Sequence, residues 1–107
     1  MENKEVAMDK SGEILDYLKK YHNSKEKAIN AGKLSTMFNT TKRGLRSIVT
    51  ELRKNSFPIC SGNVGYWYSK DLDDLDETIV RLGAQIYNME KVVKGLTQAK
   101  IQEVKDE

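Results

Sequence analysis

The chain has little of the chemistry that most enzymes and metal proteins need. It contains one cysteine, one histidine and one proline in 107 residues. A single cysteine excludes an internal disulfide, and one cysteine with one histidine argues against a zinc site. No nucleophile–base pair, phosphate-binding loop or pair of catalytic carboxylates stands out. We therefore expect neither an enzyme nor a bound cofactor or metal.

Long hydrophobic runs are also missing. No apolar run approaches the ~20 residues that a membrane span needs. The opening segment "MENKEVAMDK" lacks the apolar stretch of a secretory signal, so we predict a cytoplasmic protein without a membrane partner. The length favours one domain with an appendage.

Charge is abundant but unevenly distributed. Residues 1–70 hold 13 lysines and arginines against 7 aspartates and glutamates, whereas residues 71–107 hold 5 against 9. A basic front half is typical of a protein that binds a polyanion, although a solvated surface is the simpler interpretation.

The front half reads as a series of short elements. Residues 1–10 have no apolar period and are expected to be a flexible tail. From Ser11 the apolar residues recur at helical spacing, and a short strand around Ile29 could add one edge to a small sheet. A short helix is then predicted over "GKLSTMFN", and Thr40 or Thr41 can cap a second helix over "KRGLRSIVTELRKN". The predicted buried stripe of this second helix is Leu45, Ile48, Val49 and Leu52.

A β-hairpin is predicted after these helices. Pro58 stops the helix, and "FPICS" and "YWYS" flank the turn "GNVG", where glycine and asparagine would supply positive φ angles. Tyr66 and Trp67 occupy adjacent strand positions, so one must face the core and the other must face outward. Packing is the favoured role for this cluster, and Cys60 is expected to be a small core residue.

This order of elements resembles the winged helix-turn-helix family, most closely the N-terminal DNA-binding domain of biotin-repressor-like regulators. The resemblance covers residues 32–68, from "GKLSTMFNTTKRGLRSIVTELRKNSFPI" to the Gly65-Tyr66 pair in "GNVGYWYS". Small phage-encoded regulators are similar. The resemblance implies a reading helix that begins near Thr41 and a wing at the hairpin. Biotin binding and ligase activity are not carried over, because no catalytic domain follows.

The basic face of the second helix supplies the candidate DNA contacts. Arginine pairs well with guanine, so Arg43 and Arg46 are predicted to contact bases or phosphates, and Thr41 and Lys42 to contact phosphates. Lys33 and Ser35 on the preceding helix could touch the phosphate backbone, as could the tip of the hairpin. The full predicted set is Lys33, Ser35, Thr41, Lys42, Arg43, Arg46, Ser47, Thr50, Ser61 and Asn63.

From Leu72 onward the apolar residues follow steps of three and four. This heptad pattern predicts a coiled-coil helix in which first (a) positions carry Leu, Ile, Ile and Val, a choice that favours two parallel strands. A tetramer or an antiparallel pair stays open, because Val80, Val92, Gly83 and Gly95 permit a wider interface. The pattern fails at Lys100 and Glu103. The predicted oligomerisation residues are Ile79, Leu82, Ile86, Met89, Val93 and Leu96.

The sequence thus predicts a mainly α protein with a small β-hairpin wing. Its predicted parts are a flexible tail (1–10), a winged helix-turn-helix DNA-binding domain (11–70), a coiled-coil helix (71–99) and a frayed tail (100–107). The function expected is that of a sequence-specific regulator, such as a repressor or phage-type control protein, that binds double-stranded DNA as a dimer. The alternative is an adaptor that binds a host or replication protein.

Overall fold

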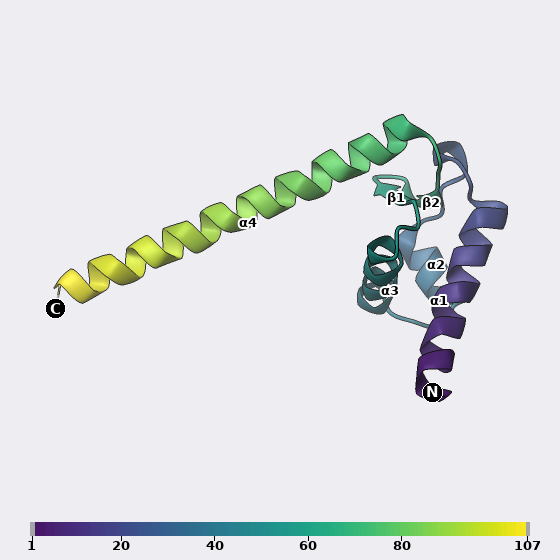
Figure 1. The fold of residues 1–107 in the computed structure, drawn as a ribbon, viewed down its shortest axis with the longest axis horizontal. Helices are drawn as coiled ribbons and strands as arrows, with labels where there is room; N and C mark the ends of the chain where they lie inside the picture. The colour runs from purple at the N-terminus through teal and green to yellow at the C-terminus, as the bar shows by residue number, and fades with distance from the viewer. Residues whose placement is uncertain (1, 107) are drawn as a thin grey trace. The chain divides into compact units, whose positions relative to one another are not determined.

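The computed structural model describes the backbone of residues 2–106 and the side chains of residues 10–105 (Figure 1). The chain is mainly helical, with a small antiparallel hairpin and a long C-terminal helix, as the sequence predicted. It divides into two compact units, Met1–Leu75 and Asp76–Glu107. The elements are α1 (Glu2–Tyr21), the 3₁₀ turn η1 (Lys25–Lys27), α2 (Ala31–Met37), α3 (Lys42–Lys54), β1 (Ile59–Gly62), β2 (Gly65–Tyr68) and α4 (Leu72–Asp106).

Two helices extend further than the apolar pattern indicated. Helix α1 begins at Glu2 instead of Ser11, and α4 continues past Ala99 to Asp106. Both added segments are rich in glutamate, lysine and other good helix formers, whose local propensity favours continuation of the helix. The expected mobility of residues 1–10 falls largely on side chains outside the described residues and stays a prediction.

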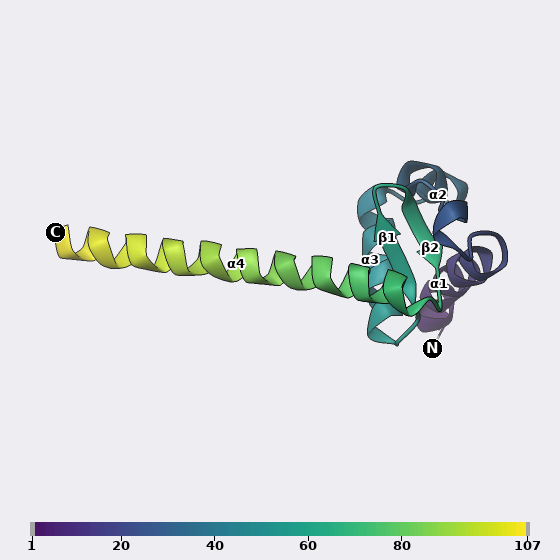
Figure 2. The same cartoon turned by 90° about the horizontal axis from the view of Figure 1, so that it is seen from above.

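The core of the first unit is formed by three helices gathered on one side of the hairpin (Figures 1 and 2). The predicted apolar residues of α1, α2 and α3 contribute to it. Within the α3 stripe, Ile48 alone is only partly buried. The buried residues of the cluster are Ile14, Leu15, Leu18, Ile29, Leu34, Leu45, Val49, Leu52 and Ile59.

The connection between α2 and α3 is short, and local contacts fix its backbone conformation. Asn39 has a positive φ of 52°, a conformation that asparagine tolerates better than most residues. Thr41 then caps α3, since its Oγ1 accepts a hydrogen bond from the Gly44 amide at 2.9 Å. A Cβ on Gly44 would collide with the Thr40 side chain, so this glycine lets the turn pack closely against the helix.

Helix α3 ends one residue before the predicted end at Asn55, in a turn that the sequence did not indicate. Asn55 is the C-cap, Ser56 has a positive φ of 70°, and the Phe57 amide donates to the Leu52 carbonyl at 3.1 Å. This closing turn satisfies carbonyl groups at the end of the helix. The helix therefore ends at Lys54, and Pro58 follows its end and does not cause it.

The hairpin pairs Ile59 with Tyr68 and Gly62 with Gly65. The short strand expected around Ile29 is present as one antiparallel bridge to Tyr66, with backbone hydrogen bonds of 2.9 and 2.8 Å. Gly65 carries the positive φ of the turn, 118°. The sequence had suggested a positive φ for Asn63 as well, but Asn63 does not have one.

Both faces of the hairpin are covered. Tyr66 and Tyr68 pack against the core cluster, while Cys60 and Trp67 are buried on the opposite face. The Trp67 indole donates to Asp74 Oδ2 at 3.1 Å, and that carboxylate lies in the first turn of α4. The residue that faces away from the core is therefore Trp67, and it is buried nonetheless.

The turn makes a sharp stability prediction. A Cβ on Gly65 would collide with the Ile29 carbonyl, and the positive φ adds strain, so Gly65→Ala should lower the free energy of unfolding by about 1–3 kcal/mol. Gly12→Ala is the control, because Gly12 lies within α1 with open space around it and alanine should stabilise there by about 0.5–1 kcal/mol. Urea titration checks both signs, and equal effects of the two variants would contradict the prediction.

Candidate nucleic-acid interface

The outward face of α3 brings together most of the predicted DNA contacts. These residues are exposed, from Lys42 at the first position of the helix to Thr50. One shallow surface depression is lined by Arg43, Arg46, Ser47, Thr50 and Glu51.

Arg43 and Arg46 are the strongest members of this face. Both side chains are exposed, and neither makes a hydrogen bond or an ion pair with another side chain of residues 10–105. Two guanidinium groups on successive turns thus point into solvent with their donors available. Such groups can bind a guanine edge bidentately or hold a phosphate.

The hydroxyl groups on the same face are used partly within the protein. Thr50 Oγ1 donates to the Arg46 carbonyl at 2.8 Å, so its proton is already engaged. Thr41 Oγ1 serves as the acceptor of the helix cap, which leaves its own proton free to donate to a phosphate. Ser47 is exposed on the same face. The geometry therefore favours Thr41 and Ser47 over Thr50 as contacts.

Ser35 does not belong to this surface. It is buried, and its hydroxyl donates to the Gly32 carbonyl at 2.9 Å. The serine packs between α2 and the rest of the unit, so we leave it out of the proposed interface.

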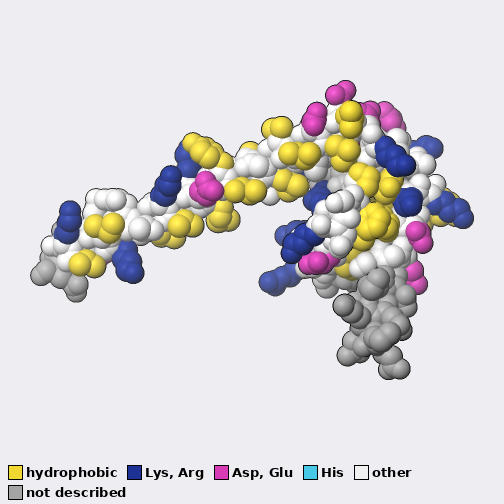
Figure 3. Space-filling model, viewed as in Figure 1, with side chains coloured by type: hydrophobic (Ala, Val, Ile, Leu, Met, Phe, Trp, Pro, Cys, Tyr) yellow, Lys and Arg dark blue, Asp and Glu magenta, His cyan; other side chains and the backbone are white. Residues whose placement is uncertain are grey.

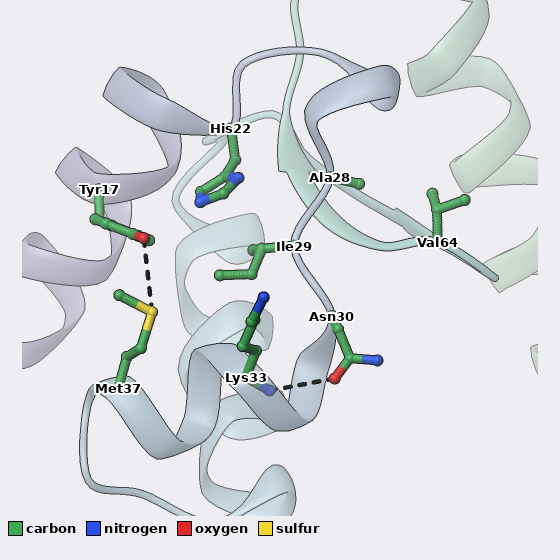
Figure 4. Close-up of a pocket in the computed structure, with 8 residues that line it drawn as sticks. All are labelled: Tyr17, His22, Ala28, Ile29, Asn30, Lys33, Met37 and Val64. Atoms are coloured by element: carbon green, nitrogen blue, oxygen red, sulfur yellow. Dashed lines mark hydrogen bonds between the residues drawn. The ribbon is translucent and has the colours of Figure 1, made fainter.

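Lys33 is exposed but lies at a different hollow, drawn in Figure 4. This pocket, of about 400 Å³, is formed by the end of α1, the segment around Ile29, α2 and the hairpin turn. The Tyr17 hydroxyl donates a hydrogen bond to Met37 Sδ at 3.6 Å across it. The Lys27 carbonyl oxygen accepts a hydrogen bond from His22 Nδ1 at 2.6 Å. Lys33 thus lines a different hollow from the one beside Arg43 and Arg46.

The hairpin tip is split between two roles. Asn63 is exposed at the turn, where a nucleic acid could reach it. Ser61 is partly buried, and its hydroxyl accepts a hydrogen bond from Arg53 Nη2 at 2.9 Å. Ser61 therefore acts first in holding the hairpin.

Arg53 was not expected to have a structural role. Its Nε donates to the Ile59 carbonyl at 2.8 Å while Nη2 donates to Ser61, so one planar side chain joins α3 to β1. Because Arg53 lies off the apolar stripe of α3, the hydrophobic pattern gives no sign of this role. The available signal was that Arg53 lies in the last turn of α3, just before the strand.

Glu51 is a second residue that the sequence analysis passed over. It shares the depression with the two arginines and pairs with Lys54 across 3.4 Å on the surface. A carboxylate here can accept a hydrogen bond from the amino group of cytosine, and it repels phosphate. The face therefore carries both basic and acidic groups.

Helix α4 carries the predicted oligomerisation residues. Five of them expose between 57% and 68% of their surface, and Leu82 is partly buried. Apolar side chains follow one another along this helix in Figure 3. The five exposed residues are Ile79, Ile86, Met89, Val93 and Leu96.

Comparison with protein-family models, curated proteins and solved structures finds no match for this chain. Among the helices of the described residues, none is both long and apolar enough to cross a membrane. Within the same residues, no three histidine, cysteine, aspartate or glutamate side chains are grouped so that they could hold a metal ion.

The free energy of unfolding distinguishes Arg53, which is bonded to β1, from the exposed arginines of α3. Arg53→Ala removes the hydrogen bonds from a charged donor to Ile59 and Ser61 and should lower the free energy of unfolding by about 1.5–3 kcal/mol. Arg53→Lys should recover little, because an ammonium group cannot reproduce the planar fork. Arg43→Ala is the matched control and should change stability by less than about 0.5 kcal/mol. Equal losses for Arg43→Ala and Arg53→Ala in urea titration would refute the assignment.

Proposed function

We propose that this protein is a sequence-specific regulator of transcription that binds double-stranded DNA as a homodimer. In this proposal residues 11–70 form a winged helix-turn-helix domain. Helix α3 enters the major groove, and the β1–β2 hairpin acts as the wing. Binding alone would perform the function, by occluding or recruiting other proteins.

The single observation that carries the proposal is the exposed pair Arg43 and Arg46 near the start of a capped helix. The N-terminal part of a reading helix meets the base edges in this class of domain. Arg43 and Arg46 lie in its first two turns, with Ser47 beside them. Two further predicted contacts, Lys42 and Thr41, flank the same end and suit phosphate.

The attachment of the hairpin to α3 supports the same proposal. Arg53 links the last turn of α3 to β1 through hydrogen bonds to the Ile59 carbonyl and the Ser61 hydroxyl. A wing that is fixed relative to its reading helix can contact the backbone beside the groove that the helix occupies. Asn63 at the tip is the side chain placed for that contact.

Dimerisation through α4 would supply the affinity that one domain lacks. A short helix with a few phosphate contacts binds weakly and loses affinity steeply with salt. Burial of an exposed isoleucine or leucine contributes roughly 1.5–3 kcal/mol before entropy is subtracted, and the stripe offers several. Two joined copies would read two half-sites, and a two-fold axis matches an inverted repeat.

An adaptor that binds another protein is the second candidate. The observation that favours it is a group of aromatic residues around Tyr17, whose ring lies 5.2 Å from that of Tyr21 and 5.5 Å from that of Phe38. Tyr21 and Met37 are 54% and 52% exposed beside it. Tyrosines are enriched at protein interfaces. The outward face of α3, by contrast, has no large apolar group and suits phosphate better.

Duplex binding tests the leading proposal. A duplex selected from a random pool should bind more tightly than bulk DNA. The double variant Arg43→Ala, Arg46→Ala should weaken that binding about 30-fold or more, because each bidentate arginine–guanine pair contributes about 1–3 kcal/mol. Gel-shift titration at fixed salt measures both affinities.

The control for that experiment changes charge equally elsewhere. Lys19→Ala with Lys20→Ala removes two exposed positive charges from α1 and should reduce affinity much less. If the pool yields no preferred sequence and both double variants bind alike, the proposed function is refuted. A pull-down with and without nuclease would then decide whether the protein binds a protein partner.

The oligomeric part has its own test. Ile86→Lys places a charge in the middle of the apolar stripe and should convert a dimer into a monomer at micromolar concentration, as measured by sedimentation velocity. Gln98→Lys adds the same charge about 120° away around the helix and should leave the dimer intact. A wild-type protein that sediments as a monomer would contradict the proposal.

A further inference from the structure

The stripe on α4 sorts its residues by shape. From Ile79 onward the first (a) positions of the heptads are Ile79, Ile86 and Val93, all β-branched, whereas the fourth (d) positions are Leu82, Met89 and Leu96, all unbranched at Cβ. In a parallel, in-register pair each a residue meets its own copy, and this division favours two strands. In an antiparallel pair a residues would meet d residues, so β-branched residues would pack against unbranched ones instead of against their own copies.

The positions beside the stripe agree with this pairing. From residue 83 to residue 99 the flanking e and g positions hold one charged residue, Glu90. A parallel pair places it beside Gln85 of the second copy, whose amide can donate to the carboxylate. In-register pairing therefore brings no like charges together along this stretch of the seam.

The apolar face also continues beyond the point where the heptads end. Helix α4 runs to Asp106, and it presents Ile101 and Val104 with 44% and 63% of their surfaces exposed. Val104 follows Ile86 by 18 residues, which is five turns at about 3.6 residues per turn, so both lie on one side of an unbent helix. Ile101 lies beside Val104, about 60° around the axis.

A change of spacing accounts for the gap. Ile101 follows Leu96 by five positions, whereas a heptad pattern would place the next apolar residue four positions after Leu96. Heptads impose a left-handed supercoil, while spacing close to 3.6 residues per turn leaves helices straight. The last apolar residues would thus meet across two helices that cease to coil after Leu96.

We propose that α4 pairs with α4 of a second copy in parallel and in register from Ile79 to Val104, as a supercoil up to Leu96 and as straight helices beyond it. This inference rests on the homodimer of the proposed function and adds its orientation and extent. It replaces the expected frayed end with a continuation of the interface.

Disulfide trapping tests the orientation. Under mild oxidation Val104→Cys should form a covalent dimer from most of the protein, because parallel pairing brings the two residues 104 together. Gln98→Cys, on the outer face, should form little. Cys60 is fully buried, so the wild-type chain provides the blank. Covalent dimers in equal amounts from both variants, or none from Val104→Cys, would overturn the parallel seam.

Dimer dissociation constants test the extent of the seam. Ile101→Ser with Val104→Ser should weaken the dimer at least tenfold in sedimentation equilibrium, whereas Gln98→Ser with Gln102→Ser, on the outer side, should not. Equal constants for the two double variants would overturn the extension. If the wild-type chain is a monomer, the proposed homodimer fails as well; if it is a dimer that fails these two tests, this inference alone is lost.

Discussion

The backbone bridge between Ile29 and Tyr66 is the constraint on which the first unit depends. It brings a segment that follows α1 against the second strand of the hairpin, and so joins the beginning of the domain to its end. The two backbones approach so closely that Gly65 must lack a side chain. Because β2 is held on this side by Ile29 and on the other by β1, the three helices have a fixed surface on which to pack.

Arg53 performs the complementary task from the helical side. Its hydrogen bonds to the Ile59 carbonyl and the Ser61 hydroxyl hold β1 against the end of α3, in addition to the core packing of Leu52 and Ile59. The exposed arginines of α3 lie earlier in the same helix and take no part in this attachment. A single helix thus contributes a buried stripe to the core, holds the hairpin through its last turn and leaves two arginines exposed in its first turns.

The sequence was informative wherever a local rule decided the structure. The Thr41 cap, the α3 stripe and the Ile29 strand follow from capping preference and hydrophobic period. It was less informative where tertiary contacts decide. Ser35 and Arg53 are polar residues that a one-dimensional pattern assigns to the surface, yet one is buried and the other is bonded to the hairpin. The end of α3 was predicted to within one residue, but the closing turn at Ser56, with a positive φ that is uncommon for serine, was not.

The carboxylate of Asp74 joins the hairpin to the start of α4. It accepts hydrogen bonds from the indole of Trp67 and, at 2.9 Å, from the hydroxyl of Ser69. Trp67 is the one tryptophan of the chain. The first unit therefore contains an intrinsic fluorophore, shielded from water, where the hairpin meets the first turn of α4, and the emission wavelength of that indole will respond when this contact opens.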